Sequence, residues 1–336
     1  MAKIKESDYL YSASRVKSIE KHMLTRERAE KMIDAKTIEE AMRVLDDCYY
    51  GYGNEITDFG DYESILAEEH KKTYDFIKSV APEAEHFNIF LYPYDYHNLK
   101  VLMKNEYLNK DETDILVDTG TIDLNVLKHA LKERNFSELT ENMGKALNEI
   151  IEDFPKTKDP QLIDVILDRY CFDEMLKSAE ETENKFIIDY VKIQIDLINV
   201  KTYVRLKKMN KSWDFLSKVF LHGGNIQEHI FIRNYDEPFE KFGELLLAYD
   251  FKDVFLEGTE ALAETGKFTR LEKLLDNKLM EHVKTAKYDP PYGIETLAGY
   301  LIAKDNEIKI ARIILAGKTA GISPELIRER VRETYV

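Results

Sequence analysis

Apolar residues recur every three or four positions along most of this chain, which is the period of an amphipathic α-helix. One predicted helical face, in the segment 62–80, consists of Tyr62, Ile65, Leu66, Glu69, Thr73, Phe76 and Val80. The segment 184–208 is apolar on nearly every side, so we expect a buried helix about 37 Å long. Thr37 and Glu40 form a capping box before another apolar face. Because no run of residues alternates as a half-buried strand does, the sequence predicts an all-α protein.

A short polar pattern recurs on three of the expected helices, in YPYDYHNLKVLMK, QIDLINVKTYVRLKK and KDNEIKIARIILAGK. The repeated positions are Asp95, Asn98 and Lys100; Asp196, Asn199 and Lys201; and Glu307 and Lys309. Asn98 and Asn199 are 101 residues apart, and Asn199 and Glu307 are 108 apart, close to one third of 336 residues. The third copy has Lys304 where the others have Asp. This spacing predicts three related but unequal units.

Four loops with helix-start signals bracket these three units. They are found at Thr25, at Asp123, around Ile226 and at Ser323, and Pro follows Ser323 as it often does at a first helical position. Gly120, Gly224 and Gly321 are interpreted as left-handed residues that end helices. The predicted domains are residues 1–110, 111–212 and 213–336. We further hypothesise that the first and last helices of the chain pack together.

Asp95 and Asn98, like Asp196 and Asn199, are three residues apart and share a helix face. A buried carboxylate or amide needs partners, for which Lys192 and backbone groups in the loops are candidates. Such a set could relay protons or ions, or it could fix the packing of each unit. We favour the packing role, because one reactive group repeated in three domains is unusual and buried polar groups can set registry.

Composition excludes several classes of protein. The net charge of −15 makes nucleic acid and bare anionic membrane poor partners and favours a basic protein surface. Two cysteines, Cys48 and Cys171, are too few for a disulfide framework and fit a reducing compartment. No apolar stretch approaches the roughly 20 residues that span a bilayer, and the start lacks a signal-peptide pattern. We expect a soluble, cytoplasmic protein.

The motifs that suggest catalysis are incomplete. Gly317-Lys318-Thr319 lacks the upstream glycine of a phosphate-binding loop, and Asp46-Asp47 lacks the third aspartate of a prenyl-transfer metal motif. The eight histidines are scattered, with no pair one helical turn apart. We therefore predict no catalytic, cofactor-binding or metal-binding residues, and no cofactor.

Longer segments carry a resemblance to a known family. They include YLYSASRVKSIEKHMLTRERAEKMIDAKTIEEAMRVLDDCYYG, YPYDYHNLKVLMK, IDYVKIQIDLINVKTYVR, FLHGGNI and DNEIKIARIILAGKTAGISPELIRERV. In order and spacing the whole chain resembles the C subunits of the A-type/V-type rotary ATPases, which are equivalent to the d subunit of the vacuolar enzyme.

The resemblance implies three similar helical-bundle domains in a funnel with pseudo-threefold symmetry. It implies a non-catalytic central-stalk protein that joins the rotor shaft to the membrane proteolipid ring and transmits torque. Such a protein is cytoplasmic and held at the membrane through the complex. The resemblance leaves two questions open: whether the coupled ion is H⁺ or Na⁺, and whether the complex makes or consumes ATP.

Two other classes fit less well. A helical scaffold or adaptor that binds other proteins is the alternative function, but peptide-binding helical repeats are usually roughly 34 to 45 residues long, which is half the period here or less. A helical metal-dependent transferase would need clustered Asp-rich motifs on facing helices, which this sequence lacks.

Overall fold

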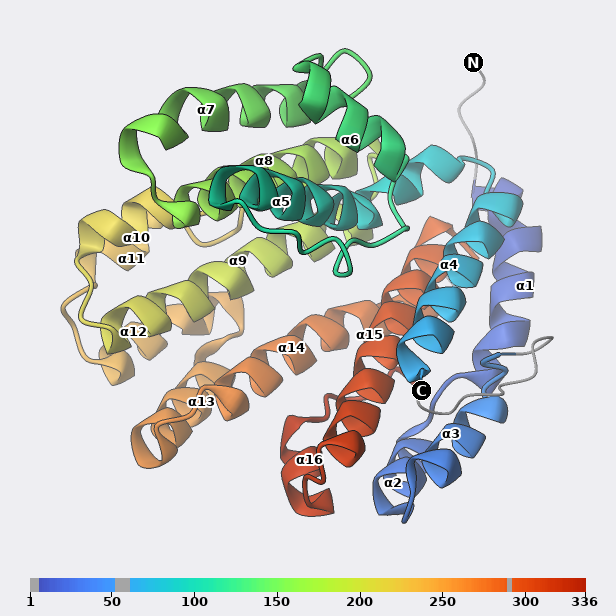
Figure 1. Cartoon of the computed structure of the whole chain (residues 1–336). Helices are drawn as coiled ribbons and strands as arrows, with labels where there is room; N and C mark the ends of the chain where they lie inside the picture. The colour runs from blue at the N-terminus through green and yellow to red at the C-terminus, as the bar shows by residue number, and fades with distance from the viewer. Residues whose placement is uncertain (1–5, 52–60, 289–291) are drawn as a thin grey trace. The chain divides into compact units, whose positions relative to one another are not determined.

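The computed structural model describes residues 6–51, 61–288 and 292–336, and these residues form helices and loops without any strand (Figure 1). The α-helices are α1 (Leu10–Ile19), α2 (Arg26–Asp34), α3 (Ile38–Asp46), α4 (Tyr62–Val80), α5 (Tyr92–Leu108), α6 (Leu124–Glu133), α7 (Glu141–Thr157), α8 (Pro160–Glu181), α9 (Lys185–Lys208), α10 (Trp213–Val219), α11 (Glu228–Arg233), α12 (Phe239–Leu245), α13 (Lys252–Thr265), α14 (Thr269–Lys284), α15 (Ile294–Thr319) and α16 (Pro324–Arg330). Short 3₁₀ helices span Glu6–Tyr9, Glu20–His22, Ala84–Phe90, Leu246–Tyr249 and Thr285–Lys287. The all-α prediction is confirmed.

The helices group into two units, one built from Met1–Ala84 with Pro238–Val336 and the other from Glu85–Glu237. These units follow the packing of neighbouring helices and do not coincide with the three predicted domains, which stay a prediction. Each unit is described separately below.

In the first unit, α15 is the central helix and contacts α1, α2, α3, α4, α14 and α16. Figure 1 shows α15, in red, running beside α4 and α1, in blue, so segments from opposite ends of the sequence lie side by side. Helix α16 also packs on α2, where the Arg328 guanidinium contacts the carboxylates of Glu30 and Asp34. The N-terminal and C-terminal helices therefore share one core.

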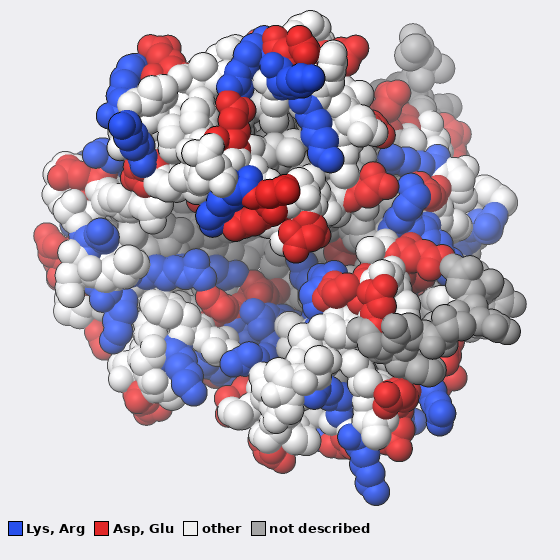
Figure 2. Space-filling model, viewed as in Figure 1, with Lys and Arg blue, Asp and Glu red and all other residues white. Residues whose placement is uncertain are grey.

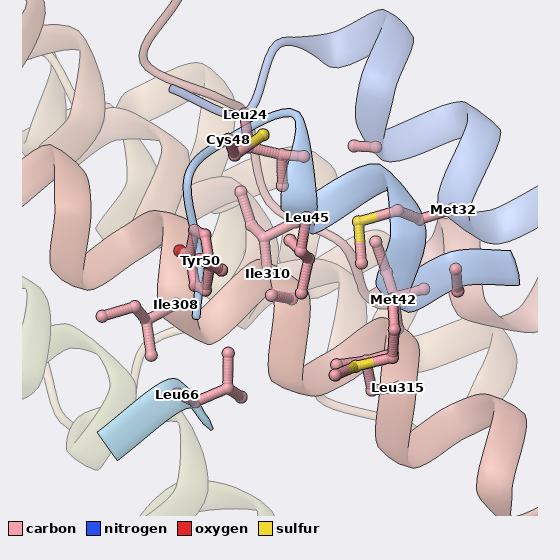
Figure 3. Packing of buried hydrophobic residues seen from close by; sticks show 14 of the residues in the cluster. Leu24, Met32, Met42, Leu45, Cys48, Tyr50, Leu66, Ile308, Ile310 and Leu315 are labelled. Atoms are coloured by element: carbon pink, nitrogen blue, oxygen red, sulfur yellow. The ribbon is translucent and has the colours of Figure 1, made fainter. Parts of the chain in front are cut away.

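That core is a cluster of buried apolar side chains, most of them from α2, α3 and α15. Figure 3 shows Met42 and Leu45 of α3 lying against Ile310 and Leu315 of α15. Leu45 and Leu315 have no exposed surface. Because close-packed interiors tolerate little loss of volume, these contacts should contribute strongly to the stability of the unit.

In the second unit, α8 contacts α5, α7 and α9. Two ion pairs tie α5 to α8, with Lys100 Nζ 2.5 Å from the Asp168 carboxylate and Lys104 Nζ 2.7 Å from that of Asp164. Both pairs are partly exposed, so they orient α5 on α8 more than they stabilise it. The apolar helix α9 is buried along most of its length, as its sequence predicts.

Several helix boundaries follow the predicted signals. Thr25 and Asp123 are N-caps whose side chains accept backbone N–H bonds at the starts of α2 and α6. Asn184, which was not among those signals, caps α9 in the same way. Ser323 is the N-cap residue of α16 and Pro324 its first residue, although the Ser323 side chain makes no capping bond. Local chemistry thus sets where these helices begin.

Charges of both signs are interspersed over the face of the molecule seen in Figure 2. The excess of negative charge in the sequence is therefore not gathered into one acidic patch on that face.

The first prediction concerns the core of the first unit. Leu45→Ala should lower the free energy of unfolding of this unit by about 2–5 kcal/mol, because loss of a fully buried leucine side chain leaves a cavity. Leu326→Ala, at a leucine that is 45% exposed on α16, is the matched control and should change it by about 0.5 kcal/mol or less. Urea unfolding followed by circular dichroism measures both, and equal effects would contradict the proposed core.

Candidate functional site

Two asparagines on long helices bind the backbone of the segment that follows. The Asn98 side chain on α5 donates to the carbonyl oxygen of Val117 and accepts from the Val117 N–H, both at 2.9 Å. Asn199 on α9 does the same with Leu221, at 2.7 and 3.0 Å. Both asparagines are 1% exposed. We call these two-bond contacts the amide clamps.

Beside each amide clamp, an aspartate one helical turn earlier binds the loop that leads to the next helix. The Asp95 carboxylate accepts from the N–H groups of Thr121 and Ile122 and from the Thr121 hydroxyl, at 2.7–3.3 Å. Asp196 accepts from the N–H groups of Asn225 and Ile226 and from the Asn225 side chain, at 2.9–3.0 Å. Neither aspartate has exposed surface. Backbone groups in the loops are thus the main partners.

The electrostatics of Asp196 fit this arrangement. Burial raises the pKa of its carboxyl, and the N–H donors of Ile226 and Asn225 work in the opposite direction. Lys192, the other partner considered from the sequence, also favours the charged form but contributes less than these bonds. The carboxylate is therefore held chiefly by hydrogen-bond donors, as buried carboxylates can be.

The predicted role of two glycines is wrong. Gly120 and Gly224 are absent from the left-handed positions that the structure shows, and α5 ends instead at the left-handed Asn109. A Cβ atom on either glycine would overlap the Asp95 or Asp196 carboxylate. Glycine is required here for close approach of that carboxylate, whereas Gly321, with φ of 66°, is left-handed as predicted.

The third repeated position uses charge instead of an amide. Glu307 on α15 accepts from the Leu24 N–H and, at 2.8 Å, from the Tyr50 hydroxyl. The Lys304 ammonium lies 2.6 Å from Glu307 and 2.9 Å from Glu69 on α4, and it is almost fully buried. Burial alone would lower the pKa of Lys304, but the carboxylates of Glu307 and Glu69 outweigh it and raise that pKa.

Loop length explains why Lys304 occupies the aspartate position. The N-cap Asp123 comes six positions after Val117, and the N-cap Gln227 comes six positions after Leu221. Leu24, in contrast, directly precedes the N-cap Thr25. The third contact thus lacks the loop whose N–H groups surround Asp95 and Asp196, and an aspartate there would be buried without those donors.

The three lysines of the repeated pattern do not form an equivalent set. Lys100 pairs with Asp168 on α8, whereas Lys309 is exposed and makes no ion pair with residues that the structure describes. Lys201 is partly exposed on α9. The feature that recurs in all three copies is therefore a backbone N–H group bound by Asn98, Asn199 or Glu307.

Glu69 and Tyr50 are the members of this set that the sequence pattern did not single out. Glu69 had a detectable signal, because a carboxylate on the otherwise apolar face of 62–80 needs a buried partner. That partner, Lys304, lies far away in the sequence, so the pairing could not be read from spacing.

The motifs set aside in the sequence have structural roles. Lys318 lies in the last turn of α15 and donates to the carbonyl oxygens of Ile33 and Ala35. Asp46 ends α3. Across the described ranges, no three His, Cys, Asp or Glu side chains gather as metal ligands would, and no helix there has the length and apolar character needed to cross a bilayer.

Comparison with known proteins gives a consistent result. Residues 13–330 match the family described as ATP synthase (C/AC39) subunit. The chain is 27% identical to the C subunit of the V-type sodium ATPase of Enterococcus hirae, over 95% of this chain and 97% of that protein. It is 25% identical to the C subunit of the A-type ATP synthase of Methanocaldococcus jannaschii, over 95% and 85% respectively.

A prediction follows for the amide clamps. Asn199→Leu keeps a similar volume but leaves the buried N–H and carbonyl of Leu221 without this partner, so we expect about 2–4 kcal/mol of lost stability. Asn148→Ala, at an exposed position on α7, should cost about 0.5 kcal/mol or less. Chemical denaturation measures both, and a neutral Asn199→Leu would show that the clamp is dispensable.

A second prediction concerns the buried charges. Lys304→Met removes the cation shared by Glu69 and Glu307 and should cost about 3–5 kcal/mol near neutral pH. The two uncompensated carboxyls then acquire pKa values above those in the unfolded chain, so the native variant binds more protons and the deficit shrinks as the pH falls. Lys309→Met on the same helix is the control, and a pH-independent deficit would contradict this account.

Proposed function

The chain belongs to the ATP synthase (C/AC39) subunit family, and we propose that it is a central-stalk coupling protein of a rotary A/V-type ATPase. In this role it joins the rotor shaft to the membrane proteolipid ring and transmits torque for ATP-coupled proton or sodium transport. It performs no bond-making step of its own.

The observation that carries this proposal is the extent of the match. The family covers residues 13–330, and the Enterococcus hirae relative is aligned over nearly the whole length of both chains. The two relatives are named as subunits of a sodium ATPase and of an ATP synthase. Their names leave both the coupled ion and the direction of the reaction open for this chain.

The proposed architecture is a funnel of three similar helical domains about a pseudo-threefold axis, residues 1–110, 111–212 and 213–336. The recurrence of one contact supports it. Asn98, Asn199 and Glu307, each in the later part of a proposed domain, all bind backbone N–H groups of a segment that precedes another helix. Repeats joined by the same contact are expected of an internally triplicated fold.

The proposed location is the cytoplasmic face of the ring, with the protein peripheral to the membrane through the complex. The net charge of −15 supports it, because cytoplasmic loops of membrane proteins carry an excess of Lys and Arg. Torque transfer also needs stiffness, which the packed helices around α15 and α8 supply.

The test is reconstitution of the complex with and without this chain. Without it, we expect the ATP-hydrolysing head to keep its activity while ATP-driven ion transport is lost, and adding the purified chain should restore transport. ATP hydrolysis and ion uptake into proteoliposomes are measured in parallel. Full coupling in the absence of the chain would overturn the proposal, and a scaffold role would predict loss of assembly instead of loss of coupling.

A further inference from the structure

A pocket of about 540 Å³ in the first unit collects positive charge, although the chain as a whole is acidic. It lies between α2, α14 and the C-terminal residues 331–336. Its cationic lining residues are Arg26, Arg270, Lys273, Lys284, Arg328 and Arg332. Glu30 and Glu333 are the acidic side chains in the same lining. We call this the basic pocket.

Four of the six cations already have a carboxylate partner. These pairs are Arg270 with Glu257, Lys284 with Glu333, Arg328 with Glu30 and Asp34, and Arg332 with Asp276. Such pairs hold the pocket walls in place and leave those cations little free charge.

Arg26 and Lys273 have no carboxylate within ion-pair distance in the ranges that the structure describes. The Lys273 ammonium donates instead to the backbone carbonyl of Arg328, at 2.9 Å. Arg26 is exposed in the first turn of α2, where the helix dipole adds positive potential. The two side chains are therefore donors without anionic acceptors.

The environment of Lys273 reflects this imbalance. Burial and the nearby charges of Arg270, Arg332 and Arg26 lower its pKa, and Glu30 opposes them only in part. An anion placed between Arg26 and Lys273 would relieve this repulsion. Arginine forks and lysine ammonium groups together are the side chains that bind phosphate oxygens.

We propose that the basic pocket binds the diphosphate group of a small molecule, with Arg26 and Lys273 as the principal ligands. A volume of about 540 Å³ lies in the range of pockets for small ligands. A diphosphate carries several negative charges. Arg26 and Lys273, which lack carboxylate partners among the residues that the structure describes, can bind such a group. The group could belong to free pyrophosphate or to a nucleoside diphosphate such as ADP, and the binding experiment separates these sources.

The experiment is isothermal titration of the full chain with pyrophosphate and, separately, with ADP at low ionic strength. We expect saturable binding that weakens as salt is added. Tighter binding of ADP assigns a nucleotide to the pocket, and equal or tighter binding of pyrophosphate assigns the phosphate group alone. Absence of saturable binding by both would overturn the proposal.

Paired variants test the location of binding. Arg26→Ala with Lys273→Ala should weaken binding at least about tenfold, because charged hydrogen bonds are lost. Lys145→Ala with Lys156→Ala removes the same charge from exposed positions on α7 and should leave binding unchanged. Equal weakening in both pairs would show non-specific attraction and refute the site. Thermal unfolding verifies that each variant is folded, and Lys273→Arg should retain binding.

Discussion

The hydrogen bonding of a connecting segment is the constraint on which this helical protein depends. Val117 and Leu221 lie outside any helix, so their N–H and carbonyl groups have no helical partner and must be satisfied elsewhere. The side-chain amides of Asn98 and Asn199 satisfy both groups at once. Since both bonds are directional, sliding the segment by one residue along the helix would break both. The clamps therefore fix the register between each long helix and the segment that follows.

The contact at Glu307 also satisfies a backbone N–H group outside the helices, but it does so with a buried charge. Its carboxylate accepts from the Leu24 N–H, but burying a charge requires a counter-charge, which Lys304 supplies. The Lys304 ammonium has room for a second carboxylate, Glu69, and this draws α4 into the contact. Each neutral amide links one helix to one segment. The charged contact instead links α15, α4 and the segment at Leu24, and its stability depends on keeping all of its charges paired.

Features with local signals were predictable from the sequence, and contacts between distant segments were not. The helices over 62–80 and 184–208, and the burial of Asp196 and Asn199 on the second of them, followed from apolar periodicity and appear in the structure. Periodicity could not show why Gly120 and Gly224 are glycines, because their close approach to a carboxylate depends on tertiary packing. The pairing of Glu69 with Lys304 and the assembly of the basic pocket likewise join segments that no spacing rule connects. Each such segment looks locally like an ordinary helix face.

If this chain transmits torque, as proposed, the loops that connect its helices must be stiff, because they deform more easily than the helices do. A helix resists bending through its own hydrogen bonds, whereas a loop between two helices yields unless its backbone is held. The amide clamps and the Glu307–Leu24 bond hold the backbone at such connections. Buried polar contacts of this kind stabilise less than an apolar core of equal size, but they resist sliding, because displacement leaves donors and acceptors unpaired. Their placement is therefore better explained by the need for a stiff register than by the need for stability alone.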